Sequence, residues 1–94
     1  MAIFMMFGKY TSEAIKGIST ERTKKAINII EENGGKVINM YAMVGEHDLV
    51  FILNLPDVEK AITVSVALKE LTGISFTTSP VVEIEKFDEL VAEV

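Results

Sequence analysis

The chain alternates between continuous apolar runs and segments with helical spacing. Apolar runs occupy residues 2–7 and 49–55, and such short runs are typical of strands that are buried on both faces. Residues 36–44 alternate, so a regular strand would place the even-numbered residues on one face and the odd-numbered residues on the other. A fourth strand is expected over residues 74–85, where Pro80 indicates an edge position or a bulge because proline cannot donate to a ladder.

Helical segments separate these strands. Residues 11–18 are compatible with a short helical turn, and Thr20 is placed to cap a longer helix that ends at Asn33-Gly34-Gly35. Residues 58–72 alternate in part like a strand, but their length and their apolar stripe favour a helix with Asp57 as its N-cap. Residues 87–91 are expected to form a short helical tail.

The order β-α-β-β-α-β predicts a single α+β domain over residues 1–94 with a ferredoxin-like antiparallel sheet. Right-handed crossovers give the strand order 4-1-3-2, with a tight hairpin at Gly45-Glu46-His47. The two long helices can cover only one face of this sheet. Because the two central strands are apolar on both faces, we expect a second copy to cover the other face, as a homodimer or a higher homo-oligomer.

The residue inventory limits the chemistry. The 94 residues include no Cys and a single His, His47, so thiol chemistry, disulfides and a multi-histidine metal site within one chain are excluded. Five Met residues occur, but strand alternation sends them to opposite faces, which favours core packing over copper binding. We therefore expect neither a metal ion nor another cofactor.

The net charge of −5 is unevenly spread, since residues 48–94 carry nine acidic and three basic side chains. This balance argues against nucleic acid and against anionic membranes as partners. Arg22, Lys24 and Lys25 are interpreted as a solvated helix face. The apolar start of the chain is too short for a signal peptide, so a cytoplasmic protein is expected.

The polar residues at one end of the predicted sheet form the candidate site. Antiparallel pairing brings the start of the third strand beside the end of the first, and the fourth strand begins there too. A His–Asp pair among hydroxyls can orient a small polar ligand or move a proton. Alternatively, the aspartate only caps a helix or pairs with Lys9, and the histidine is only a loop residue. The candidate ligand-binding residues are Tyr10, Thr11, His47, Asp48 and Thr77.

Four short motifs share the order and spacing of a known family. They are Phe7-Gly8-Lys9-Tyr10-Thr11, Gly34-Gly35-Lys36-Val37, Gly45-Glu46-His47-Asp48 and Pro56-Asp57. With them the chain resembles the GYD domain family over essentially its whole length, although His47 stands where the Gly-Tyr-Asp signature has tyrosine. The resemblance implies the fold of the dimeric α+β barrel superfamily, which includes cofactor-independent oxygenases and amino-acid-sensing domains.

Two functions follow as expectations. The first is a small-molecule-binding or regulatory dimer without chemistry. The alternative is a small cofactor-independent enzyme, oxygenase-like or isomerase-like, that acts on an apolar molecule with a carbonyl group. The identity of the ligand or substrate does not follow from the sequence.

Overall fold

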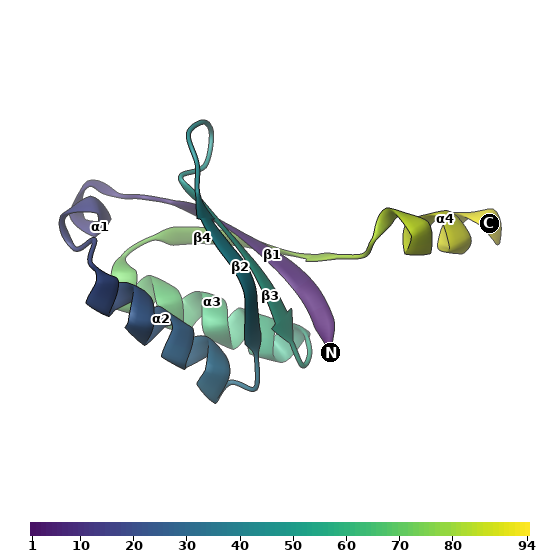
Figure 1. Cartoon of the computed structure of the whole chain (residues 1–94), viewed down its shortest axis with the longest axis horizontal. Coiled ribbons are helices and arrows are strands. Elements are labelled where there is room, and N and C mark those ends of the chain that lie inside the picture. The colour runs from purple at the N-terminus through teal and green to yellow at the C-terminus, as the bar shows by residue number, and fades with distance from the viewer.

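A computed structural model describes all residues, 1–94, and shows one four-stranded sheet with two long helices against one of its faces (Figure 1). A short helix precedes the first long helix, and a further helix stands away from the sheet near the end of the chain. The elements are β1 (Ala2–Lys9), α1 (Ser12–Lys16), α2 (Thr20–Glu32), β2 (Lys36–Ala42), β3 (Leu49–Leu55), α3 (Val58–Thr72), β4 (Ser75–Val81) and α4 (Ile84–Ala92).

The sheet has the strand order β2-β3-β1-β4, which is the predicted order 4-1-3-2 read from the other edge. β1 pairs antiparallel with β3 on one side and with β4 on the other, so Met5 lies between Ile52 and Ser79. The proline-bearing strand β4 is at an edge, as expected. The ferredoxin-like fold predicted from the sequence is therefore confirmed.

The core lies between the sheet and helices α2 and α3. Strands β1 and β3 contribute every second residue to it, and the intervening residues Met5, Phe7 and Ile52 are only half-buried on the opposite face. We call this opposite side the open face. Its apolar character confirms that the central strands do not alternate to polar. The buried cluster contains Phe4, Met6, Ala26, Ile30, Phe51, Leu53, Leu55, Ala61, Val64 and Leu68.

Three local predictions were wrong. The N-cap of α2 is Ser19 rather than Thr20, because the Ser19 hydroxyl accepts from the backbone N–H of Arg22 at 3.0 Å. A register shift between Val37 and Asn39 breaks the alternation of β2, so Val37 packs against the core on the same side as Met40. The last strand ends at Val81 rather than at residue 85, because Val82 and Glu83 form a connection and α4 begins at Ile84.

The β2–β3 connection is longer than the tight turn expected. Residues 43–48 form a loop that projects beyond the sheet in Figure 1. It is closed by the backbone N–H of Met43, which donates to the carbonyl oxygen of Asp48 at 2.8 Å. None of the helices combines the length and apolar character needed to cross a bilayer.

Leu53 tests the location of the core, because its side chain is fully buried in the central strand β3. We expect Leu53→Ala to lower the free energy of unfolding by about 2–5 kcal/mol, through lost transfer energy and the cavity left behind. Val44→Ala is the control, since Val44 is fully exposed in the β2–β3 loop, and it should change stability by less than about 0.5 kcal/mol. Urea denaturation measures both; equal effects would contradict this placement of the core.

Candidate functional site

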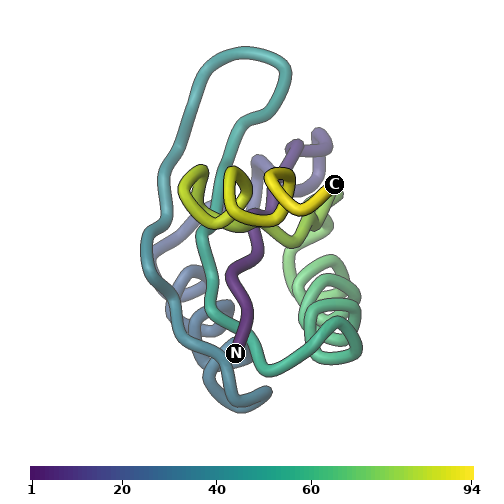
Figure 2. Tube along the Cα trace, turned by 90° about the vertical axis from the view of Figure 1, so that its right-hand side faces the viewer, coloured from purple at the N-terminus to yellow at the C-terminus, as the bar shows by residue number.

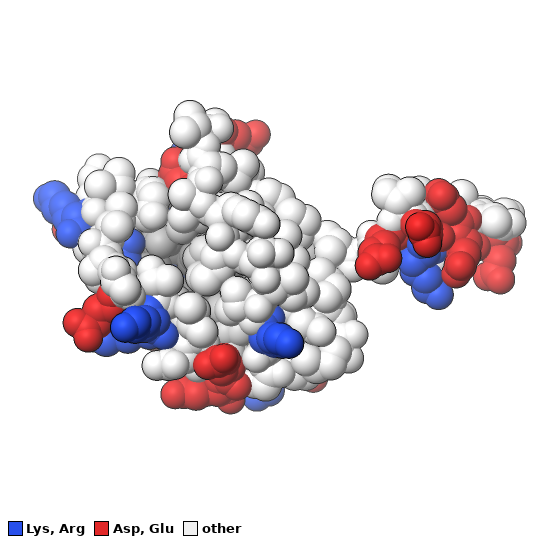
Figure 3. Space-filling model, viewed as in Figure 1, with Lys and Arg blue, Asp and Glu red and all other residues white.

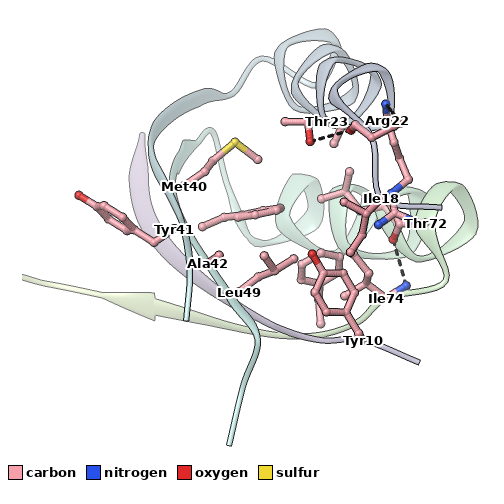
Figure 4. Close-up of a pocket in the computed structure, with 15 residues that line it drawn as sticks. Tyr10, Ile18, Arg22, Thr23, Met40, Tyr41, Ala42, Leu49, Thr72 and Ile74 are labelled. Atoms are coloured by element: carbon pink, nitrogen blue, oxygen red, sulfur yellow. Dashed lines mark hydrogen bonds between the residues drawn. The ribbon is translucent and has the colours of Figure 1, made fainter. Parts of the chain in front are cut away.

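A cavity opens between the sheet and the junction of α1 and α2 (Figure 4). Its volume is about 170 Å³ and most of its lining is apolar. The strands contribute its floor, α3 closes one side, and the first turn of α2 closes another. The lining residues are Tyr10, Ile18, Ser19, Arg22, Thr23, Ala26, Met40, Tyr41, Ala42, Leu49, Phe51, Leu68, Thr72, Ile74 and Phe76.

Arg22 brings a positive charge to this cavity. It lies in the first turn of α2 and is half-buried. Its Nη1 donates to the carbonyl oxygen of Ala14 at 2.7 Å, so the side chain runs back over α1. Gly17 allows this path, because a Cβ there would lie 2.7 Å from the same nitrogen. The remaining N–H groups of the guanidinium are free to meet a ligand.

Tyr10 provides the second polar group at the cavity. Its backbone N–H donates to Oδ2 of Asp48 at 2.8 Å, which holds the exit of β1 in place. Figure 4 shows its ring among the lining side chains, whereas the ring of Tyr41 points away from the cavity. The Tyr10 hydroxyl makes no hydrogen bond within the chain, in contrast to Thr72, whose hydroxyl donates to Leu68 and accepts from Ile74.

The residues predicted from the sequence separate into three places, and only Tyr10 lines the cavity. Asp48 and Thr11 have structural partners. The backbone N–H of Asp48 donates to Gly8 at 2.8 Å while its carboxylate accepts from Tyr10. Thr11 caps α1 by accepting from Ala14 at 3.0 Å, and its hydroxyl donates to Gly73 at 3.4 Å.

His47 and Thr77 lie on the side of the sheet away from the cavity. The His47 ring packs against the Phe7 ring with centroids 5.1 Å apart. Thr77 is the partner of Phe7 in the β1–β4 register, so its side chain shares the open face. The structure thus places His47 against Phe7, whose face of the sheet Thr77 shares, but directs the Asp48 carboxylate to the end of β1. A ligand role for these five residues stays a prediction.

Sequence reasoning missed Arg22, which was interpreted as part of a solvated helix face. The signal was present in its spacing. Arg22 precedes the buried Ala26 and Ile30 by four and eight residues, so it lies on the apolar stripe of α2. A charged residue on such a stripe either extends to solvent or faces a pocket. Nowhere in the chain do three His, Asp or Glu side chains gather in a way that would hold a metal ion.

Comparisons with known proteins agree with the fold. The model of the GYD domain matches residues 4–91. No curated protein matches the sequence. Among solved structures, the leucine response regulatory protein of Mycobacterium tuberculosis superposes with a TM-score of 0.58 at 8% identity, covering 87% of this chain and 51% of that one. An AsnC family transcriptional regulator from Agrobacterium tumefaciens gives 0.59 at 17% identity, covering 87% and 50%. The chain spans about half the length of these regulators.

Asp48 tests how the β1 exit is held. Asp48→Ala leaves the backbone N–H of Tyr10 without its acceptor at 2.8 Å, and we expect a loss of about 1–3 kcal/mol in the free energy of unfolding. Glu46→Ala removes a carboxylate from the same loop, but there only the backbone carbonyl is used, as the acceptor for Lys9. Glu46→Ala should therefore leave the melting temperature unchanged. Equal melting temperatures for the two variants would contradict a structural role for Asp48.

Proposed function

The chain belongs to the GYD domain family, and from this premise we propose that it is a small-molecule-binding module that acts as a homodimer. The observation that carries the proposal is an apolar cavity with a charged guanidinium and an unpaired hydroxyl at its lining. A largely apolar pocket with a few convergent polar groups is the usual form of a ligand site.

The lining favours a small apolar molecule with one acceptor group. The cavity of about 170 Å³ is close to the ~150 Å³ of an engineered apolar cavity in another protein that binds benzene, so a ligand with roughly one ring or a short branched chain fits. Arg22 and the Tyr10 hydroxyl both donate, which suits a carboxylate or a carbonyl oxygen. The apolar part of the ligand would contact Leu49, Phe51 and Phe76.

Binding is favoured over catalysis by what the lining contains. Its polar residues are Tyr10, Ser19, Arg22, Thr23, Tyr41 and Thr72. None of them is a carboxylate or an imidazole, the side chains that most often act as general bases near neutral pH. Asp48 is engaged by the backbone of Tyr10, and His47 lies against Phe7. The alternative of a cofactor-independent enzyme has no comparable support.

The structural neighbours support a regulatory use of this fold. One of them is named for its response to leucine, a small molecule with an apolar side chain and a carboxylate. At 8% identity this likeness carries the fold alone, so leucine itself is not transferred to this chain. The shared point is that a ferredoxin-like domain of this size serves as part of a regulator.

Self-association is proposed from the open face. Ile3, Met5, Phe7, Val50 and Ile52 are half-buried there, although no layer of the same chain covers them. A second copy can cover the face by packing sheet against sheet at about 10 Å. Burial of these side chains then drives association.

The cavity predicts which compounds bind. In a thermal-shift screen of small apolar carboxylates and ketones, we expect at least one to raise the melting temperature. Tyr10→Phe should weaken the binding of that compound by removing the free hydroxyl. It should not change the melting temperature of the protein without ligand, because the hydroxyl has no partner in the chain. Ala42→Phe should abolish the response by filling the cavity from its edge.

Met43→Phe is the matched control, since it adds the same ring at the next position without lining the cavity. Its response to the compound should equal that of the unmodified protein. A compound whose stabilisation survives Ala42→Phe would show that this cavity is not the binding site.

The open face predicts a dimer in solution. We expect light scattering at micromolar concentration to give twice the mass of 10.4 kDa. Ile52→Glu should convert it to a monomer with unchanged far-UV circular dichroism, because Ile52 lies outside the buried cluster. A stable monomer of the unmodified chain would refute the self-association.

A further inference from the structure

Helix α4 buries nothing against its own chain. None of its residues is buried, and Ile84, Phe87, Leu90 and Val91 are 72%, 51%, 48% and 49% exposed. Their spacing places them on one side of the helix. The connection through Val82 and Glu83 carries α4 clear of the sheet, as Figures 1 and 2 show. An amphipathic helix of nine residues is not stable alone in water, so this apolar side needs a partner.

The opposite side of α4 is acidic. Residues 82–94 hold five acidic side chains and one basic one, a charge of −4 out of the total of −5. Residues 1–81 therefore carry only −1. Figure 3 shows this acidic cluster on the projecting helix and a paler, mixed surface on the rest. A partner for α4 must thus offer apolar contact and tolerate acidic neighbours.

The same chain has an apolar groove between α3 and β4. It encloses about 320 Å³ and is lined by Phe4, Val58, Ala61, Ile62, Ser65, Val66, Phe76, Thr78 and Pro80. Val58, Ile62 and Val66 are 56%, 59% and 55% exposed and recur every four residues, so they form a stripe along α3. The stripe is about 12 Å long at 1.5 Å per residue. Ile84 to Val91 of α4 spans nearly the same length.

We propose that α4 of one copy packs into the α3–β4 groove of a second copy. The inference rests on the proposed self-association and does not depend on the ligand. Apolar side chains pack against apolar side chains along matched lengths. The charges of α3 beyond Val66 are Lys69 and Glu70, which cancel, so the contact rests on apolar packing.

The direction of α4 favours a second copy over its own groove. α4 stands on the side of the strands opposite to α2 and α3 (Figures 1 and 2). That is the side of the open face, where a second sheet would lie about 10 Å away with its own helices beyond it. α4 is therefore directed toward the helix layer of the partner. Each copy offers one helix and one groove, so the contact closes by two-fold symmetry.

Cysteine pairing tests the contact, because the chain has no cysteine of its own. Val91→Cys and Ile62→Cys are prepared as separate full-length chains, one of them carrying a mass tag, then mixed and mildly oxidised. We expect a disulfide-linked heterodimer as the main product. Val91→Cys mixed with Glu32→Cys, at the end of α2, should give none. Absence of the Val91–Ile62 product overturns the proposal. So does a disulfide within a single chain when Val91→Cys and Ile62→Cys are combined in one chain.

A second variant measures the same contact at equilibrium. Phe87 is exposed within its own chain, so Phe87→Asp cannot unfold a single copy by disturbing its core. We expect the dimer dissociation constant in analytical ultracentrifugation to rise about tenfold or more, as for an aromatic anchor, while Glu89→Gln leaves it unchanged. An unchanged constant for Phe87→Asp in a protein that still dimerises would overturn the role of α4 and leave the sheet-to-sheet dimer standing.

Discussion

Two helices cannot cover both faces of a four-stranded sheet, and the rest of this structure follows from that constraint. α2 and α3 cover the core face, where Met6, Leu53 and Leu55 are fully inaccessible. The alternate residues of β1 and β3 are apolar as well, and the chain has no third layer for them. A small domain has little stability to spare, so apolar surface left in water is best used for association. The apolar open face therefore favours association with a second copy of the chain.

The cavity arises where the first crossover departs from the sheet. Asp48 holds the backbone of Tyr10 at 2.8 Å, and Thr11 caps α1, so the chain leaves β1 along a fixed path before it turns into α2. α1 ends at Gly17, whose missing side chain lets Arg22 reach back to Ala14. These local hydrogen bonds keep the first turn of α2 away from the sheet and leave space between them. The polar residues noticed in the sequence thus shape the site more than they line it.

The strand order and the open face could be predicted from the sequence. They depend on crossover handedness, which is a general rule, and on a hydrophobic pattern that extends over many residues. The register shift at Val37 could not be predicted, since one extra residue in β2 leaves no pattern in the sequence. The end of β4 was placed too late because Val82 and Ile84 continue the alternation, although Val82 lies in the connection and Ile84 begins α4. Arg22 was missed because a charged residue on an apolar stripe can either extend to solvent or face a pocket. Only the path of its side chain over Gly17 in the structure distinguishes the two. His47 and Asp48 adjoin in sequence, but their side chains have different partners on different sides of the structure.

The cavity and the open face lie on opposite sides of the same strands. The Met40 side chain faces the cavity, whereas the ring of its neighbour Tyr41, the register partner of Val50, points away from it toward the open face. Phe51 likewise faces the cavity, while its neighbours Val50 and Ile52 lie on the open face. A ligand can alter assembly only if its contacts differ between the free and the assembled protein. Here one strand's thickness separates the two surfaces, so a ligand that moves β2 at Met40 also moves Tyr41. Because β2 is an edge strand, held by β3 alone, fewer ladder bonds resist that movement than in the central strands β3 and β1.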